Sequence, residues 1–481
     1  MVRFIWVLGA LAAINLTVAL AETAGERRLA KPEHYDLALT VDFDAGTIAG
    51  SAAIRLANPH DRPLADVSFL LYRLMSVKAV RDQAGNAVSF TQEVAAFEDE
   101  PTWQINHIVV HLAQPLASGE RTTLKLDYEG HLLGYAETGA LYIQDRVDPA
   151  YSIIREDALA YPVPRTASFA INRAAGFPAF DYRASITVPK SHVVANSGKL
   201  VTRTVRGGAA TYVYESLKPS WRMDFAVAPF GMIERGRLRV FHLPEDAQGA
   251  ELLVQAMERC FALYAHWFGE LKGSSRFTVI ELPEGWGSQS DVTGILQEAP
   301  AFRNPDNFYE AYHEISHLWN VPSLDAAPPR IEEGLAMFLA YLAAERLDKQ
   351  KPIADRAVAR LERARKQIAG NDKLRTVPMA DYGRQQMTDY SYGIGQLMFH
   401  LLHAAMGEDR FNAALARLYR DYRRSGATTQ DFVRMFEENG PPGVGRIFDD
   451  WLRTTKWTEL VSSGQSFDQI SARYGVPKAA N

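Results

Sequence analysis

The chain has 481 residues, of which 47% are hydrophobic and 23% are charged, and its formal net charge is −5. This composition is typical of globular proteins, and the length accommodates two or three domains. The small acidic excess indicates neither a nucleic-acid-binding surface nor a polybasic membrane patch, so we expect no nucleic-acid partner. With one cysteine, Cys260, the chain cannot form an internal disulfide, and its fold must rest on a hydrophobic core.

The first segment has the pattern of a targeting sequence. Arg3 precedes a mostly apolar run over residues 4–20, and Ala19-Leu20-Ala21 supplies the small residues of a cleavage site. This pattern predicts a secretory signal peptide of residues 1–21 and an exported protein, periplasmic or secreted. The alternative is an uncleaved N-terminal anchor. No later stretch is long and apolar enough to cross a bilayer, so we expect no membrane span in the mature chain.

Residues 22–236 have the pattern of a β domain. Apolar and polar residues alternate over residues 34–43, the period of a half-buried strand, and residues 122–128 and 182–188 repeat the pattern. Turn signals such as "DQAGN" and "RGG" separate the runs. We therefore predict an antiparallel, β-sandwich-like domain.

The pattern changes near residue 237. Residues 249–268 carry apolar side chains at helical spacing, with Cys260 in the apolar stripe, and the strand pattern "RFTVIEL" follows. Helical patterns then continue almost to the end of the chain. The prediction is an α+β multidomain protein, with a mainly helical domain over residues 237–465 and a loosely attached tail over residues 466–481.

The stretch "AYHEISHLWN" places two histidines four residues apart on a predicted helix that begins at Asn304 or Asp306. Residues four apart share a helix face, so His313 and His317 can offer two ring nitrogens to one metal ion. Glu314 lies about 100° round the helix, outside the ligand set but within reach of a water at the metal. The alternative is a helix that carries the two histidines by chance.

A catalytic zinc site needs a third protein ligand. In "PPRIEEGLAMF" two glutamates occupy the first turn of a predicted helix, and we take Glu333 as the ligand and Glu332 as the spare. The alternative is that these acids only stabilise the helix dipole.

These motifs resemble the gluzincin zinc aminopeptidases typified by aminopeptidase N, whose pattern is H-E-x-x-H, eighteen residues, then the glutamate of N-E-G-F-A. Here fifteen residues separate His317 from Glu333. The resemblance implies a thermolysin-like catalytic domain with one Zn²⁺ held by His313, His317 and Glu333, and Glu314 as general base.

The resemblance covers most of residues 33–460 and leaves no counterpart of the family's C-terminal helical repeat domain. The segment "FPAFDYRASITV" is similar to a strand of the family's N-terminal domain, and "SWRMDFAVAPF" to that domain's closing strand. The segment "TDYSYGIGQLMFHLL" is similar to the helix with the Y-x-K-G motif. It places the tyrosine that stabilises the oxyanion at Tyr390, with Tyr392 where lysine is usual.

One departure bears on specificity. The family carries G-A-M-E-N, whose glutamate binds the substrate's free amine, and the best match here, "SQSDVTGI", puts Asp291 in its place. The alternative is that this stretch is a solvated turn. The expected function is zinc-dependent removal of N-terminal residues from peptide substrates. Glycyl-aminopeptidase-like or endopeptidase specificity, and a non-catalytic peptide-binding scaffold, remain as alternatives.

Overall fold

The computed structural model describes residues 29–135, 143–271, 276–291 and 293–476, so the predicted signal peptide lies outside the described residues. The chain forms two compact units. Unit 1 comprises Met1–Ala247 and Ser275–Glu298, and unit 2 comprises Gln248–Ser274 and Ala299–Asn481. Each unit is described by itself.

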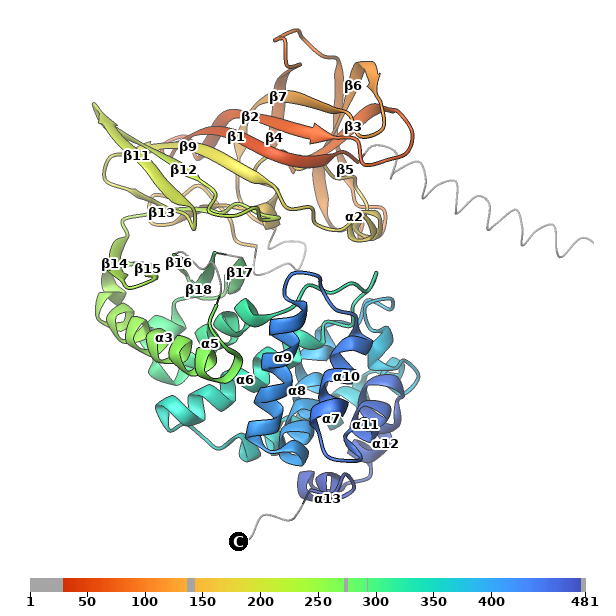
Figure 1. The fold of residues 1–481 in the computed structure, drawn as a ribbon. Coiled ribbons are helices and arrows are strands. Elements are labelled where there is room, and N and C mark those ends of the chain that lie inside the picture. Colours follow the sequence, from red (N-terminus) through yellow and green to blue (C-terminus); the bar gives the residue numbers. More distant parts are fainter. Residues whose placement is uncertain (1–28, 136–142, 272–275, 292, 477–481) are drawn as a thin grey trace, which may run out of the picture. The chain divides into compact units, whose positions relative to one another are not determined.

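Unit 1 contains a seven-stranded sheet of order β11-β12-β9-β1-β2-β7-β4 (Figure 1). In β1 the side chains of Leu37, Leu39 and Val41 are buried and those between them are exposed, which is the predicted alternation. The strand pairs antiparallel with β2 and parallel with β9. The strands are β1 Lys31–Asp42, β2 Thr47–Ala57, β4 Met75–Arg81, β7 Arg121–His131, β9 Asp181–Pro189, β11 Lys199–Arg206 and β12 Ala209–Glu215.

A second sheet, of order β3-β6-β5, shares one hydrophobic core with the first. Leu37 of the large sheet and Phe69 and Ile105 of the small one belong to the same buried cluster, so the predicted β-sandwich is confirmed. A third sheet has the order β10-β13-β8. The remaining elements are β3 Leu64–Tyr72, β5 Phe90–Ala96, β6 Gln104–Leu116, β8 Ser152–Ile154, α2 Phe169–Ala175, β10 Val193–Ala195 and β13 Phe225–Ala228.

A five-stranded sheet of order β14-β15-β16-β18-β17 also belongs to unit 1. Its inner strands β15, β16 and β18 run parallel, and β17 lies antiparallel at one edge. Phe241 and Ile280 of this sheet belong to one buried cluster with Ile153 and Ala226 of the third sheet, so the two sheets pack together. The strands are β14 Gly231–Arg235, β15 Leu238–His242, β16 Phe277–Leu282, β17 Gln289–Asp291 and β18 Gly294–Glu298.

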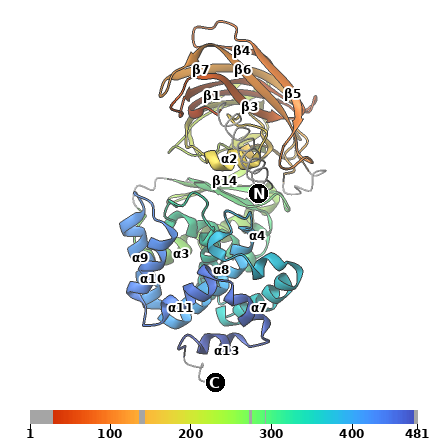
Figure 2. The same cartoon turned by 90° about the vertical axis from the view of Figure 1, so that its right-hand side faces the viewer.

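Unit 2 is mainly helical, as predicted (Figure 2). Helices α6 and α8 approach closely where Gly334 meets Gly395, since a Cβ added to Gly334 would lie 2.7 Å from the Gly395 Cα. Cys260 is buried in α3. The helices are α3 Ala247–Phe268, α4 Pro300–Arg303, α5 Phe308–Ser316, α6 Ile331–Asp348, α7 Ile353–Gly370, α8 Asp389–Met406, α9 Glu408–Tyr422, α10 Thr429–Asn439, α11 Val444–Phe448, α12 Lys456–Ser462 and α13 Phe467–Ala472.

Two helix boundaries differ from the sequence-based expectation. Asn304 caps a short 3₁₀ turn by accepting a hydrogen bond from the Asp306 backbone, and the helix with the histidines begins only at Phe308. The expected tail instead contains α13, where Ile470 is buried. This helix begins with a capping box, a local signal that the loose-tail interpretation overlooked.

Across the described part of the chain, we find no helix with both the length and the apolar character that a bilayer crossing requires.

Candidate metal centre

Helix α5, the 3₁₀ turn after it and the first turn of α6 bring three potential metal ligands together. His313 lies in the last turns of α5, His317 opens the turn His317–Trp319, and Glu333 lies in the first turn of α6. They form the group of metal-ligating side chains found among the described residues. The structure thus places the three predicted ligands in one cluster.

The spacing of the three donor atoms fits one tetrahedral ion. The Nε2 atoms of His313 and His317 lie 3.1 Å apart, and Glu333 Oε2 lies 3.4 Å and 3.5 Å from them, respectively. Ligands about 2.0–2.1 Å from a tetrahedral zinc ion lie about 3.3 Å from one another. Two imidazoles and one carboxylate are also a donor set that catalytic zinc uses. These residues can therefore hold one zinc ion.

The electrostatics favour an ionised Glu333. Burial raises the pKa of its carboxyl, but hydrogen bonds from His313 and His317 and the positive charge of Arg330 outweigh burial and hold it well below its usual range. For His317, burial lowers the pKa, and the hydrogen bond and charge of Glu333 reverse this effect, so the pKa is raised overall. Each group stabilises the charge of the other.

Arg330 orients the carboxylate. Its guanidinium donates from Nη2 to Glu333 Oε1, which leaves Oε2 directed at the two histidines. Arg330 precedes α6 with φ 56° and ψ 41°, a left-handed conformation that is uncommon outside glycine. Such a conformation costs about 1–3 kcal/mol and persists only where the surrounding structure holds it.

The other ring nitrogens of the two histidines have different surroundings. The Asn320 side-chain amide lies 2.7 Å from His317 Nδ1. Ligation through Nε2 requires that this amide turn its oxygen towards an Nδ1–H group. Within the described residues, His313 Nδ1 is buried without a hydrogen-bond partner.

The two neighbouring glutamates lie outside the donor cluster. The charge of Glu314 contributes to the raised pKa of both His317 and Tyr392, which places its carboxylate within electrostatic range of the centre. Burial raises the pKa of Glu332, and its Oε1 lies 3.9 Å from Arg330 Nε. Of the two acids at the start of α6, Glu333 is the one that faces the histidines.

Two tyrosines of α8 have different partners. The ring of Tyr392 lies parallel to that of His313, with centroids 6.3 Å apart and an interplanar angle of 6°. Burial raises the pKa of Tyr392, and the charge of Glu333 and a hydrogen bond to it raise it further. The Tyr390 hydroxyl accepts a hydrogen bond of 2.9 Å from Asn371 Nδ2. Residues two apart lie about 200° apart round a helix, so the two side chains leave α8 in different directions.

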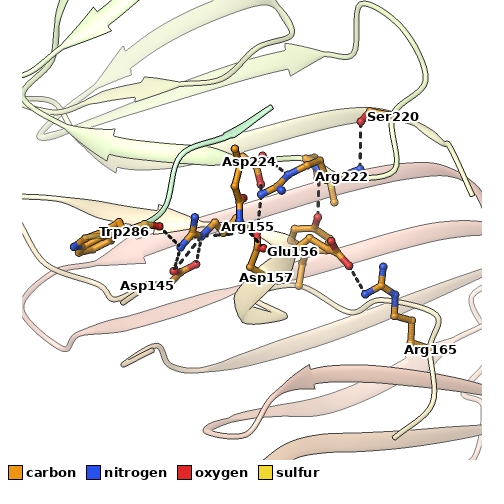
Figure 3. Close-up of polar contacts among 12 residues, drawn as sticks. Asp145, Arg155, Glu156, Asp157, Arg165, Ser220, Arg222, Asp224 and Trp286 are labelled. Atoms are coloured by element: carbon orange, nitrogen blue, oxygen red, sulfur yellow. Dashed lines mark hydrogen bonds and ion pairs between the residues drawn. The ribbon is translucent and has the colours of Figure 1, made fainter. Parts of the chain in front are cut away.

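Asp291 lies in unit 1, at the end of edge strand β17. Its Oδ1 accepts a hydrogen bond from Ser220 and its Oδ2 one of 3.4 Å from Thr293. Ser220 borders the buried charged cluster of Figure 3, where its Oγ accepts a hydrogen bond from the Arg222 backbone. Asp291 also lines a small pocket together with Asp224.

Sequence reasoning missed Arg330 and assigned no role to Tyr392. Arg330 has no motif of its own, and its role follows only once the start of α6 is known. Tyr392 was noted as an exception at a lysine position, although its place one helical turn before Gln396, on the face towards α6, was available from helical spacing.

No protein-family model matches the chain. Among curated proteins, it is 22% identical over 469 residues to aminopeptidase M1-B of Oryza sativa subsp. japonica, covering 89% of this chain and 50% of that protein. It is 19% identical to aminopeptidase A of Gloydius brevicauda, covering 88% of this chain and 46% of that protein. The chain spans about half the length of these curated relatives.

Solved structures share the fold. The M1 zinc metallopeptidase of Deinococcus radiodurans matches with a TM-score of 0.62 and 19% identity, covering 88% of this chain and 94% of that one. Yeast LTA4 hydrolase matches with a TM-score of 0.62 and 15% identity, covering 88% of this chain and 68% of that one. The chain has the fold of the M1 zinc metallopeptidases, and the resemblance to zinc aminopeptidases drawn from its motifs is confirmed.

Proposed function

We propose that the chain is a zinc-dependent peptidase that removes N-terminal residues from peptides. The observation that carries this proposal is the triangle of His313 Nε2, His317 Nε2 and Glu333 Oε2, with sides of 3.1, 3.4 and 3.5 Å. These three residues would hold a zinc ion, which would supply Lewis-acid chemistry to a water molecule and to the scissile carbonyl. The M1 aminopeptidases among the relatives support this reaction class.

Glu314 is the proposed general base. It follows His313 directly on α5 and its side chain is only partly buried, so it borders the centre without entering the donor cluster. Its carboxylate accepts a proton from the attacking water and then transfers this proton to the leaving amine. A carboxylate beside the ligands, rather than among them, is free to take part in both transfers.

Tyr390 is the proposed oxyanion donor, and the hydrogen-bond partners of the two tyrosines support this division of roles. The Tyr390 hydroxyl accepts from Asn371, so its own proton remains available for the developing oxyanion. The charge of Glu333 raises the pKa of Tyr392, whose ring lies parallel to that of the ligand His313, so Tyr392 is close to the proposed ligands. Tyr392 therefore acts as a positioning residue for the ligand.

Asp291 is the proposed site for the free amine of the substrate. Its Oδ1 accepts a hydrogen bond from Ser220 and its Oδ2 one from Thr293, and these two bonds orient the carboxylate. Asp224 lines the same small pocket, but its carboxylate is already paired with Arg222, so Asp291 is the acid proposed to receive the amine. A carboxylate pairs more strongly with an ammonium group than with a neutral one.

We also propose that the protein is exported. The basis is the sequence pattern of residues 1–21, and the N-terminal sequence of protein recovered from a periplasmic extract tests it. A chain that begins at Glu22 supports the proposal, whereas a chain retained in the cytoplasm with residues 1–21 attached contradicts it.

The central experiment measures zinc content and hydrolysis together. Purified protein is expected to bind one zinc per chain and to cleave peptides with a free amine but not their N-acetylated counterparts. Glu314→Gln should retain zinc while kcat falls about 10²–10⁴-fold. Cleavage of the blocked peptides would assign endopeptidase specificity instead. Zinc binding without hydrolysis of either set would support a non-catalytic peptide-binding protein.

A further inference from the structure

A basic pocket lies between α6, α7 and α8 of unit 2. Its cavity volume is about 370 Å³, within the size range of small-ligand sites. Three arginines of α7 line it at positions i, i+4 and i+7, namely Arg356, Arg360 and Arg363. This spacing puts them in one row on the helix. Lys351 adds a fourth positive charge.

These cations are held by neutral groups. Arg356 donates a 2.9 Å hydrogen bond to the Gln350 side chain, and its guanidinium lies 4.1 Å from the centre of the Tyr341 ring. Arg360 donates from Nε to Gln396 Oε1 over 3.0 Å. The Arg356 and Arg360 side chains are thus oriented by uncharged groups and not by an acidic partner.

The positive charge of the pocket is not balanced by acids. Within the residues that the structure describes, Lys351, Arg356, Arg360 and Arg363 take part in no ion pair, and Asp355 is the one acid that lines the pocket. Like charges so close together repel, and a bound anion would relieve the repulsion. A pocket with fixed donors and excess positive charge is suited to an anionic ligand.

The pocket and the metal centre draw residues from the same helices. Tyr309 of α5, whose ring contacts Arg356 of the pocket, precedes His313 by four residues and shares its face. Tyr341 of α6 lines the pocket and follows Glu333 by eight residues, about 80° round the helix. The Tyr309 and Tyr341 rings meet with centroids 5.1 Å apart. Because a helix rises 1.5 Å per residue, these offsets correspond to about 6 Å and 12 Å along the two helices.

Helix α8 contributes residues to both the basic pocket and the surroundings of the metal centre. Gln396, which orients Arg360, follows Tyr392 by four residues and lies one turn further along the helix. Arg360 also approaches Gly393, where an added Cβ would lie 2.9 Å from its Nη1 atom. The basic pocket is therefore a neighbour of the metal centre within unit 2.

We propose that this pocket binds the C-terminal carboxylate of short peptide substrates, an inference that rests on the proposed peptidase function. A guanidinium fork matches a carboxylate with two parallel hydrogen bonds. An extended peptide advances about 3.3–3.6 Å per residue, so the 6–12 Å offset corresponds to about two to four residues. The pocket would thus select peptides by length as well as by charge.

Kinetics with matched peptides test the proposal. The substrates are Ala-Ala-Ala, its C-terminal amide and an amide with an internal aspartate, Ala-Ala-Asp-amide. We expect Arg360→Gln and Arg363→Gln to raise KM for the free acid about tenfold at unchanged kcat and to leave the simple amide unaffected. The exposed Arg363 keeps the test valid if Arg360→Gln fails to fold. Lys366→Gln, on an exposed position of the same helix, is the matched control.

A binding measurement separates this proposal from the proposed function. Calorimetry on the Glu314→Gln protein should show that the free tripeptide binds about tenfold more tightly than its amide, and that Arg363→Gln abolishes the difference. If this binding difference is found but the unaltered protein hydrolyses no peptide, the proposed carboxylate pocket is supported and the proposed peptidase function is contradicted. Hydrolysis with equal affinity for acid and amide would overturn the pocket. If Ala-Ala-Asp-amide binds as tightly as the free acid, the pocket recognises acidic side chains as well, and the terminal-carboxylate proposal is overturned.

Discussion

Two buried polar clusters, one in each unit, differ in how their charged groups are paired. In unit 1, Arg155 contacts Asp145 at 2.9 Å, and Arg222 contacts Asp157 and Asp224 at 2.6 and 2.7 Å (Figure 3). Positive and negative groups alternate through this cluster, and Arg155 and Asp145 have no exposed side-chain surface. Each charge that is removed from water meets an opposite one.

The metal centre of unit 2 has a different arrangement of polar groups. His313 and His317 direct two nitrogen lone pairs at one point, and the single carboxylate of Glu333 joins them. The two imidazole nitrogens at 3.1 Å make at most one hydrogen bond with each other, and the carboxylate of Glu333 is shared between both rings and Arg330. A buried cluster in which opposite charges alternate stabilises the fold, whereas two nitrogen donors and one carboxylate that converge on a single point indicate a ligand.

The largest expected effect is the loss of a paired charge in unit 1. Burial already raises the pKa of Asp145 to about 6, against the opposing charge of Arg155. Arg155→Met leaves this buried carboxylate without its partner, and we expect the free energy of unfolding to fall by about 3–5 kcal/mol. Urea unfolding at pH 7 measures it. Arg183→Met, in an exposed pair with Glu215, is the control and should cost less than about 1 kcal/mol. Equal losses in the two variants would contradict the contrast.

Substitution of the two tyrosines of α8 tests their proposed roles at the metal centre. Tyr390→Phe removes the proposed oxyanion donor, so kcat should fall by the equivalent of about 3–4 kcal/mol while zinc affinity is unchanged. Tyr392→Phe removes a hydroxyl that interacts with Glu333, and zinc affinity should fall about 10–100-fold. Steady-state kinetics and a competitive zinc titration on both variants provide the measurements. If Tyr392→Phe instead lowers kcat at full zinc occupancy, the two roles must be exchanged.

A smaller effect is expected from the contact of α6 with α8. Gly334 follows the ligand Glu333, and an added Cβ would lie 2.6 Å from the Ser391 carbonyl oxygen. Gly334→Ala should therefore force the helices apart, at a cost of about 1–3 kcal/mol, and weaken zinc binding. Thermal unfolding and zinc titration test both effects. Gly370→Ala, at a helical glycine with no atom within 4 Å of the added Cβ, should be neutral or stabilising. A neutral Gly334→Ala would show that this contact does not position the ligand.

The sequence was sufficient for features with a regular period and insufficient for those set by tertiary contacts. Strand alternation and helical spacing predicted the sandwich and the helices, and motif spacing brought His313 and Glu333 together. The orientation of Glu333 depends on Arg330, whose left-handed backbone is held by contacts that form only when α6 is in place. The roles of Asp291 and Tyr390 stay predictions, because each depends on where a bound peptide lies.

The last effect, small at neutral pH, concerns a buried histidine that has no opposite charge beside it. Burial and the nearby positive charges of His403 and Arg360 lower the pKa of His400 to about 3, and Gln396 lies 3.3 Å from its Nε2. Because Gln396 Oε1 accepts from Arg360, its amide nitrogen must donate to His400, which therefore has to be neutral.

The sign of the pH dependence follows from this neutral histidine. Below the unfolded pKa of about 6.5, His400 is protonated in the unfolded chain. In the folded chain it stays neutral until the pH falls to about 3. The free energy of unfolding should therefore fall with decreasing pH by up to about 1.4 kcal/mol per pH unit from this residue. Removal of the imidazole by His400→Gln should remove that part of the slope, measured by urea unfolding at pH 6 and pH 4. An unchanged slope would mean that His400 takes up its proton in the folded protein, and that the Gln396 hydrogen bond does not hold it neutral.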